Sequence, residues 1–270
     1  MSLLNRRHYH NKFVGGMNDK RYNFDNLACG LIAAHPGHEG LLYGWLELAK
    51  PHVFILSDGS GVTGKSRLEY SRTLIRAAAA LEGVVFGGCS DRRWYQSMLE
   101  GDINLFTSCQ DEIFAAAAAN KIRMIVTDPV EFYNPLHDLA NAMAHGVAER
   151  LSEQKDSQTH VWTYEIVRSR RHDADSLKIR LDKEQSARKL SAAESYSPLS
   201  SEVREFEEQL HADNERLFAD DAYFDWPIEL GFEPYYEEVG RKRTLQGKYE
   251  KVITYREHVR PIALSIGAGQ

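Results

Sequence analysis

The feature that most constrains the fold is a regular alternation of short apolar runs and longer helical patterns over residues 28–151. The apolar runs cover residues 29–34, 52–58, 84–88 and 122–128. A helical pattern follows each run, which predicts a mostly parallel sheet with helices on both faces, an α/β fold. Ligands of such sheets collect beyond the carboxyl ends of the strands, so the loops there are the first place to look for a site.

The alternation stops after residue 151, and we expect a C-terminal helix and hairpin extension of the same domain. The single domain would span residues 1–270, with a core of about 27–150 and an extension of about 151–270. Within the extension the patterns predict an edge strand at 161–167, helices at 175–193 and 201–218, and a strand at 248–257.

Composition excludes several functional classes. The net charge is −6, with 33 basic and 39 acidic residues, which argues against a nucleic-acid partner. No apolar stretch approaches the roughly 20 residues that a membrane span requires, and the N-terminus does not have the pattern of a signal peptide, so we expect a cytoplasmic protein. The three cysteines are irregularly spaced, which argues against a disulfide framework and against a cysteine zinc site.

Three histidines form a candidate metal site. His35 and His38 follow the first apolar run, and His137 follows the fourth, so all three are expected at the same edge of the sheet. Zinc binds neutral imidazole readily, and three protein ligands leave a position open for water, as in catalytic zinc sites. The alternative is that these are loop histidines that bond to backbone carbonyls.

The order of several motifs resembles the GlcNAc-phosphatidylinositol de-N-acetylase family, also called PIG-L or LmbE-like deacetylases. The motifs are LIAAHPGHEG after the first run, FILSDGSG at the second, CSD after the third and NPLHD after the fourth. The stretch KEQSARKLSAA also resembles the helix that follows in the family. The resemblance implies a Rossmann-like fold, a zinc cofactor, and zinc ligands at His35, His38 and His137.

The sequence departs from the family motifs at the residues that move protons. The family has AHPDDE where this chain has AHPGHE, so His38 replaces a ligand Asp and Gly37 replaces the family's general base. Asn134 stands where the family has an oxyanion-polarising His, and an Asn can still donate a hydrogen bond to an oxyanion. The resemblance therefore implies a retained metal site with an altered or missing catalytic base.

Several carboxylates could compensate for Gly37. Glu39 and Asp138 each neighbour a proposed ligand, and either could act as the base or could orient a ligand imidazole. Asp58 and Asp91 also lie in strand-end loops and are candidates for substrate binding, although Asp91 could equally cap a helix.

Residues 59–66 provide a competing interpretation, because they fit the phosphate-binding pattern G-x-x-x-x-G-K-S between a strand and a helix. In that case Lys65 would contact phosphates, Ser66 would hold magnesium, and Asp128 would be the acidic partner. The alternative is a loop beside the metal site in which Lys65 meets an anionic group of the substrate.

Three functional hypotheses follow from these motifs. The first is a zinc-dependent hydrolase that removes an acyl group from an amino sugar or a related small-molecule or glycan substrate. The second is an NTP-binding enzyme that uses residues 59–66. The third is a family member that binds metal or sugar without hydrolysis, because Gly37 lacks the usual carboxylate. The oligomeric state, the acyl group and the sugar stay open.

Overall fold

The computed structural model describes residues 24–154, 158–166, 176–196, 214–220 and 223–267. The strands are β1 (Cys29–Ala33), β2 (His52–Ser57), β3 (Leu81–Cys89), β4 (Met124–Thr127), β5 (His160–Thr163), β6 (Ser176–Arg180) and β7 (Asn214–Ala219). The α-helices are α1 (Tyr43–Ala49), α2 (Leu68–Ala77), α3 (Asp91–Glu100), α4 (Ile103–Ala119), α5 (Pro135–Glu153), α6 (Lys183–Ser195), α8 (Tyr235–Leu245) and α9 (Arg260–Ile266). Shorter helical turns lie at Phe24–Asn26, His38–Leu42, Gly61–Thr63 and Tyr255–Val259.

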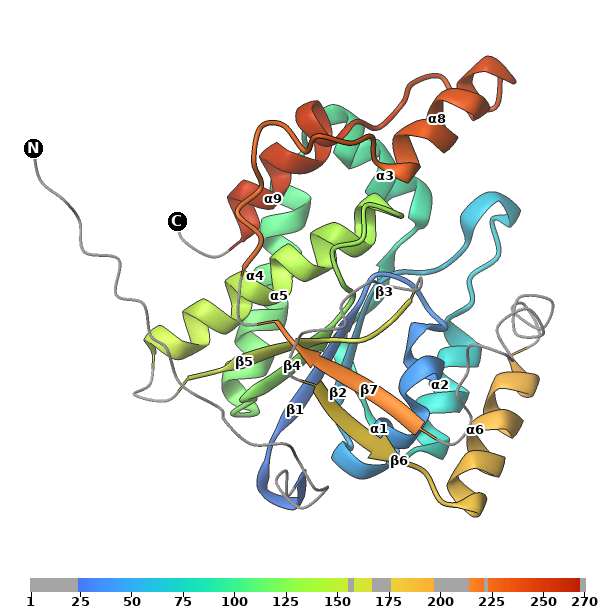
Figure 1. Ribbon diagram of the computed structural model, residues 1–270, viewed down its shortest axis with the longest axis vertical. Coiled ribbons are helices and arrows are strands. Elements are labelled where there is room, and N and C mark those ends of the chain that lie inside the picture. Colours follow the sequence, from blue (N-terminus) through green and yellow to red (C-terminus); the bar gives the residue numbers. More distant parts are fainter. Residues whose placement is uncertain (1–23, 155–157, 167–175, 197–213, 221–222, 268–270) are drawn as a thin grey trace, which may run out of the picture.

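The seven strands form one mixed sheet in the order β3-β2-β1-β4-β5-β7-β6 (Figure 1). β3, β2, β1, β4 and β5 are parallel, and β7 is antiparallel to both of its neighbours. Every residue of β1 and β4 is buried, as expected for strands covered on both faces. The α/β, mostly parallel architecture predicted from the alternating pattern is therefore confirmed.

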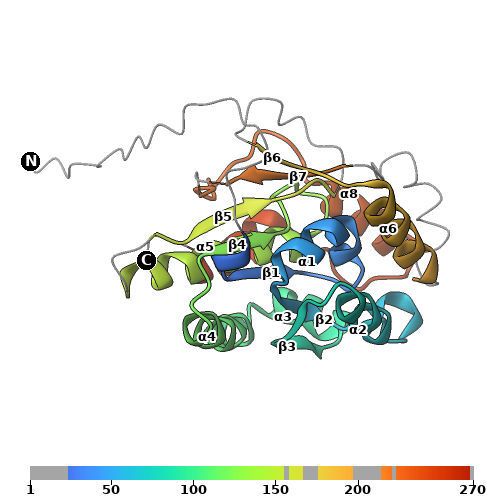
Figure 2. The same ribbon diagram turned by 90° about the horizontal axis from the view of Figure 1, so that it is seen from below.

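Two hydrophobic clusters hold the layers together, one on each face of the sheet. Trp94 of α3, Phe106 of α4 and most of the apolar side chains of α5 pack against one face. Trp45 of α1 and Leu74 of α2 pack against the other, with α6 beside them. Figure 2 shows α4 and α5 on one side of the sheet and α1 and α6 on the other.

The extension after residue 151 differs from the sequence prediction in three places. β5 is an interior strand, since it pairs with β4 on one side and β7 on the other, so the predicted edge strand is wrong. The predicted helix at 175–193 begins as β6 and becomes α6 only at Lys183. The predicted helix at 201–218 ends in β7, and its residues 201–213 lie outside the described residues.

The tail also departs from its predicted strand at 248–257. Residues 248–254 form turns and irregular backbone, and Tyr255–Val259 is a π-helical turn that leads into α9. Tyr255 and Val259, four residues apart on this turn, are buried against the first core.

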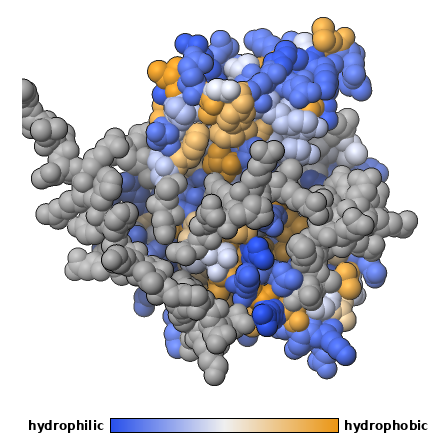
Figure 3. Space-filling model, viewed as in Figure 1, coloured by the Kyte–Doolittle hydropathy of each residue, from blue (hydrophilic) through white to orange (hydrophobic). Residues whose placement is uncertain are grey.

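In the view of Figure 3, hydrophilic residues predominate at the top around α8, and a group of apolar residues lies directly below them. The exposed large apolar side chains of the C-terminal region include Ile228, Phe232, Tyr235 and Leu245. Among the described residues, none of the helices has the length and apolar character needed to cross a bilayer.

Candidate metal centre

The candidate site lies where the strand order reverses. The chain runs outward from β1 through β2 to β3 and then returns to place β4 on the other side of β1. The crevice beyond the carboxyl ends of β1 and β4 is thus the switch point at which such sheets bind ligands. His35 comes shortly after β1, and His137 lies in the first turn of α5, which follows β4.

The structure brings the three predicted histidines together. Each of His35, His38 and His137 has one ring nitrogen that lies within 4.8 Å of a ring nitrogen of each of the other two. Three nitrogens at this spacing could hold a metal ion. His35 Nδ1 lies 3.2 Å from His137 Nε2. Two nitrogens bound to one tetrahedral zinc at 2.0–2.1 Å lie about 3.3 Å apart, so this spacing fits a shared zinc ion.

A carboxylate lies beside each of two of these imidazoles, hydrogen-bonded to His38 and in a longer contact with His35. Asp91 Oδ1 lies 3.5 Å from His35 Nε2, and Asp128 Oδ1 lies 3.0 Å from His38 Nδ1. A carboxylate on the far nitrogen fixes the tautomer of a ligand histidine and leaves its other nitrogen for the metal. Within the described part of the chain, His137 Nδ1 has no such partner.

Asp128 is itself held by a buried network, and sequence reasoning missed this role. Its carboxylate accepts hydrogen bonds from the Ala34 amide (2.9 Å) and from the Tyr164 hydroxyl. Its backbone carbonyl accepts a hydrogen bond from Asn141, whose amide nitrogen also donates to Asp220. The signal for this role is the position of Asp128 at the end of the fourth apolar run, at the same edge of the sheet as the histidines. From the sequence, Asp128 was predicted only as a partner of magnesium.

The electrostatics of the site favour neutral imidazole at two of the three positions. Burial lowers the pKa of His35 to about 4, and the positive charge of His38 adds to this shift. Burial and the charge of His38 also lower the pKa of His137 well below its usual value. Burial acts in the same direction on His38, but the charge and hydrogen bond of Asp128 outweigh it and raise the pKa of His38. His35 and His137 are therefore ready to bind a cation, whereas His38 retains a proton more strongly.

The two carboxylates predicted as candidate bases are bonded to the loop backbone. Glu39 is fully buried, and its Oε2 accepts a hydrogen bond from the Gly37 amide (2.8 Å). Asp138 Oδ1 accepts from the amides of Glu131 and Phe132. Burial raises the pKa of Glu39 and raises that of Asp138 further, which favours neutral carboxyl groups. These contacts support a loop-fixing role over proton acceptance.

Asn134 occupies the N-cap of α5, directly before the helix that carries His137. Its Oδ1 accepts hydrogen bonds from the Leu136 amide (2.9 Å) and from the Tyr95 hydroxyl (3.1 Å). Both bonds use the oxygen, which leaves the amide nitrogen as the donor predicted for an oxyanion. Burial raises the pKa of Tyr95, so its hydroxyl stays a donor to Asn134.

The loop at residues 59–66 is built around carboxylates. Asp58 Oδ1 accepts from the amides of Ser60 and Asp91, and Asp91 Oδ2 accepts from the Gly61 amide. In a phosphate-binding loop such amides face the anion, and carboxylates at these positions repel it. α2 begins only at Leu68, so the loop is also not followed directly by a helix at Lys65, and the geometry disfavours the NTP-binding interpretation.

Arg67 is the cation that this loop places near the histidines. Its Nε donates to the Gly59 carbonyl (2.8 Å), and its charge acts on both His35 and His38. The side chain of Lys65 is exposed, and its predicted contact with substrate stays a prediction. Arg67 was not predicted from the sequence, because the G-x-x-x-x-G-K-S pattern contains Lys65 and ends one residue before Arg67.

The chain is similar in structure to deacetylases. The matches include a triple mutant of the deacetylase of the teicoplanin biosynthetic pathway, with 13% identity, a TM-score of 0.49, and coverage of 72% of this chain and 100% of that chain. They also include the A40926 pseudoaglycone deacetylase (12% identity, TM-score 0.43, 71% and 96% covered) and the zinc-inhibited form of teicoplanin deacetylase (12%, 0.39, 72% and 100%).

The sequence comparisons give no match. A scan against protein-family models finds none that fits the chain. No curated protein matches it either. The structural matches are deacetylases, the class of enzyme that the sequence motifs resemble.

Proposed function

We propose that the protein is a zinc-dependent amide hydrolase that removes the acyl group from an N-acylated amino sugar or a related metabolite. The observation that carries this proposal is the convergence of His35, His38 and His137 at the switch point of the sheet. The resemblance of the sequence motifs to PIG-L deacetylases supports the choice of substrate class.

The donor set suits zinc. Three imidazoles with carboxylate support on two of them match the composition of catalytic zinc sites, and burial favours the neutral form of His35 and His137. When bound, zinc supplies Lewis-acid polarisation of a carbonyl group and activation of water. The residues of this chain hold the ion, orient the substrate and accept the proton.

Asp91 is the carboxylate that we assign to proton transfer. It is 6% exposed, and its Oδ2 is held by the Gly61 amide. Its Oδ1 faces His35 Nε2 at 3.5 Å, and among the described residues it has no hydrogen-bond donor. Glu39 Oε1 and Asp138 Oδ2 also lack a hydrogen-bond partner among the described residues, so the choice of Asp91 rests on its contact with the proposed ligand His35.

The polar groups around the histidines suit the charge that develops during amide hydrolysis. Negative charge builds up on the carbonyl oxygen, and preorganised donors and cations stabilise it. Arg67, fixed by Gly59, contributes positive charge near the site. Asn134 contributes an amide donor whose orientation Tyr95 fixes.

The test combines metal content with turnover. Wild-type protein should hold about one zinc per chain and release acetate from at least one member of a panel of N-acetylated amino sugars. His137→Ala should lose both properties, and His52→Ala, at the opposite end of β2, should lose neither. Wild-type protein without zinc would contradict the proposal, and full zinc without turnover on any acyl sugar would favour a binding protein.

A further inference from the structure

Two buried charges from the C-terminal extension contact each other beneath the segment that follows His38. Lys189 lies on α6 and Glu215 on β7, and their side chains are 2% and 1% exposed. Lys189 Nζ lies 2.9 Å from Glu215 Oε1. We call Lys189 and Glu215 the buried pair.

The buried pair bonds the backbone of residues 41–45 from two sides. Lys189 Nζ donates to the Leu41 carbonyl (3.0 Å), and the two carboxylate oxygens of Glu215 accept from the amides of Gly44 and Trp45 (2.8 Å each). These amides lie in the first turn of α1, which has no side-chain cap of its own. Glu215 therefore caps α1 from a distance of about 170 residues along the chain.

Leu41 belongs to the turn His38–Leu42, so this contact fixes one end of the ligand loop. The other end is fixed where Asp128 accepts the Ala34 amide. We propose that the buried pair is a positioning device for His38, which holds the turn so that the imidazole reaches Asp128 and the other two histidines. The proposal rests on the metal site put forward above and names residues far from it in sequence.

The energetics of buried ion pairs favour a positioning role over a purely stabilising one. Burying two charges costs about as much free energy as their attraction returns, and neutral replacements of both are often harmless to stability. What the pair supplies is fixed geometry. The fit around α1 is correspondingly close, because a Cβ added to Gly44 would meet Leu181 Cδ2 at 2.2 Å.

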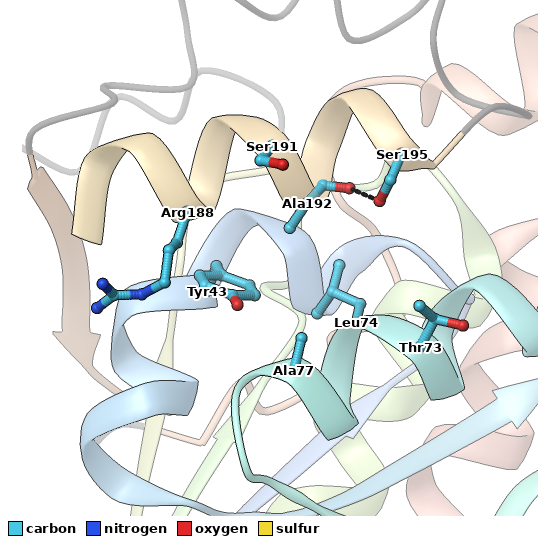
Figure 4. Close-up of a pocket in the computed structure, with 8 residues that line it drawn as sticks. All are labelled: Tyr43, Thr73, Leu74, Ala77, Arg188, Ser191, Ala192 and Ser195. Atoms are coloured by element: carbon cyan, nitrogen blue, oxygen red, sulfur yellow. Dashed lines mark hydrogen bonds between the residues drawn. The ribbon is translucent and has the colours of Figure 1, made fainter. Parts of the chain in front are cut away.

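An ion pair between α6 and α1 provides a control. Arg188 of α6 bonds Glu47 of α1 through two nitrogens, at 2.6 and 2.9 Å. Figure 4 shows Arg188 beside Tyr43, at the edge of the groove where α6 lies over α1 and α2. This pair also links α6 to the region of α1, but neither of its side chains bonds the backbone of residues 41–45.

The experiment measures Co²⁺ binding by the full-length protein, with affinity from titration and ligand geometry from the visible absorption spectrum. The double variant Lys189→Met with Glu215→Gln removes both buried charges at similar volume, but it leaves the Leu41 carbonyl and one α1 amide without their partners, so its apo thermal midpoint should fall moderately while the protein stays folded. Its Co²⁺ affinity should fall by about 10–100-fold, with an altered spectrum, as for other residues that orient ligands. Arg188→Ala should keep wild-type affinity and spectrum.

Single variants extend the test. Glu215→Gln alone leaves Lys189 without its carboxylate partner, so both stability and affinity should fall, and the double variant should recover part of the stability but none of the affinity. A folded double variant with wild-type Co²⁺ affinity and spectrum would overturn the positioning role. Wild-type protein that takes up no Co²⁺ or Zn²⁺ would overturn the proposed metal site and this inference together.

Discussion

His38 Nδ1 lies 3.0 Å from Asp128 Oδ1, and this contact raises the pKa of an imidazole whose burial alone would lower it. A proton therefore competes with a metal for the His38 imidazole. The lowered pKa values of His35 and His137 keep those two imidazoles unprotonated and free to bind a metal. The proton occupies His38 below its raised pKa, so metal binding should strengthen as pH rises through that value and level off above it.

Calorimetric titration with Zn²⁺ in two buffers of different ionisation enthalpy measures the proton released. At a pH below the raised pKa of His38, wild-type protein should release about one proton per zinc bound. Asp128→Asn removes the charge that raises this pKa, so it should release less than wild type at the same pH. Equal release by both proteins would contradict the role of Asp128.

Asp91 could accept the proton or could orient His35, and the variant Asp91→Asn distinguishes these two roles. If Asp91 accepts the proton, Asp91→Asn should keep zinc and lose about 10²–10⁴-fold in turnover. If it only orients His35, the same variant should lose about 10–100-fold in zinc affinity and recover turnover at saturating zinc. Turnover measured against zinc concentration distinguishes the two results, and Glu39→Gln serves as the comparison carboxylate.

Asn134 is expected to have two separable roles. Asn134→Ala removes the cap of α5 and should lower the free energy of unfolding by about 1 kcal/mol, measured by denaturant titration. Asn134→Asp keeps an oxygen for the Leu136 amide but has no amide donor, so it should keep the stability and lose turnover. Wild-type turnover in Asn134→Asp would show that the side chain is only a cap.

Gly37 cannot be converted simply into the family's catalytic Asp. Its φ of 108° lies in the left-handed region that favours glycine. Gly37→Asp and Gly37→Ala should therefore both lose about 1–3 kcal/mol of stability, and neither should gain turnover. An Asp variant that is as stable as wild type and faster would show that the loop accepts the carboxylate after all.

Arg67 and Lys65 offer a direct comparison of two nearby cations. Arg67→Ala should reduce turnover, because its charge acts on His35 and His38, whereas Lys65→Ala should have a smaller effect. Wild-type protein should show no magnesium-dependent thermal stabilisation by ATP, since a ligand that binds only the native state raises the melting temperature. A stabilisation that disappears in Lys65→Ala would restore the NTP-binding interpretation.

The sequence predicted the first half of the fold well because its signals are local. Buried parallel strands appear as continuous apolar runs, so β1, β2, β3 and β4 were located to within a few residues. The three histidines could be grouped in advance because the carboxyl ends of neighbouring parallel strands meet at one edge.

The rest depends on contacts between distant segments. β7 pairs on both sides, and the helical pattern assigned to its region could not show this tertiary pairing. The bond between Tyr164 and Asp128 and the backbone bonds of Glu39 and Asp138 likewise follow from loop geometry. Residue identity alone made these carboxylates look equivalent, and only their contacts separate the carboxylates beside ligand histidines, Asp91 and Asp128, from those bonded to loop backbone, Glu39 and Asp138.

The position of β7 between β5 and β6 also sets an order of assembly. β6 precedes β7 in the chain, but among the described strands it pairs only with β7, so neither β6 nor the outer edge of β5 can complete this pairing until residues 214–219 have been synthesised. A nascent chain that ends before Glu215 would expose a strand edge and leave Lys189 without its carboxylate. The three proposed ligand histidines have all been synthesised by residue 137. The buried pair that holds the turn after His38 is complete only in the last quarter of translation.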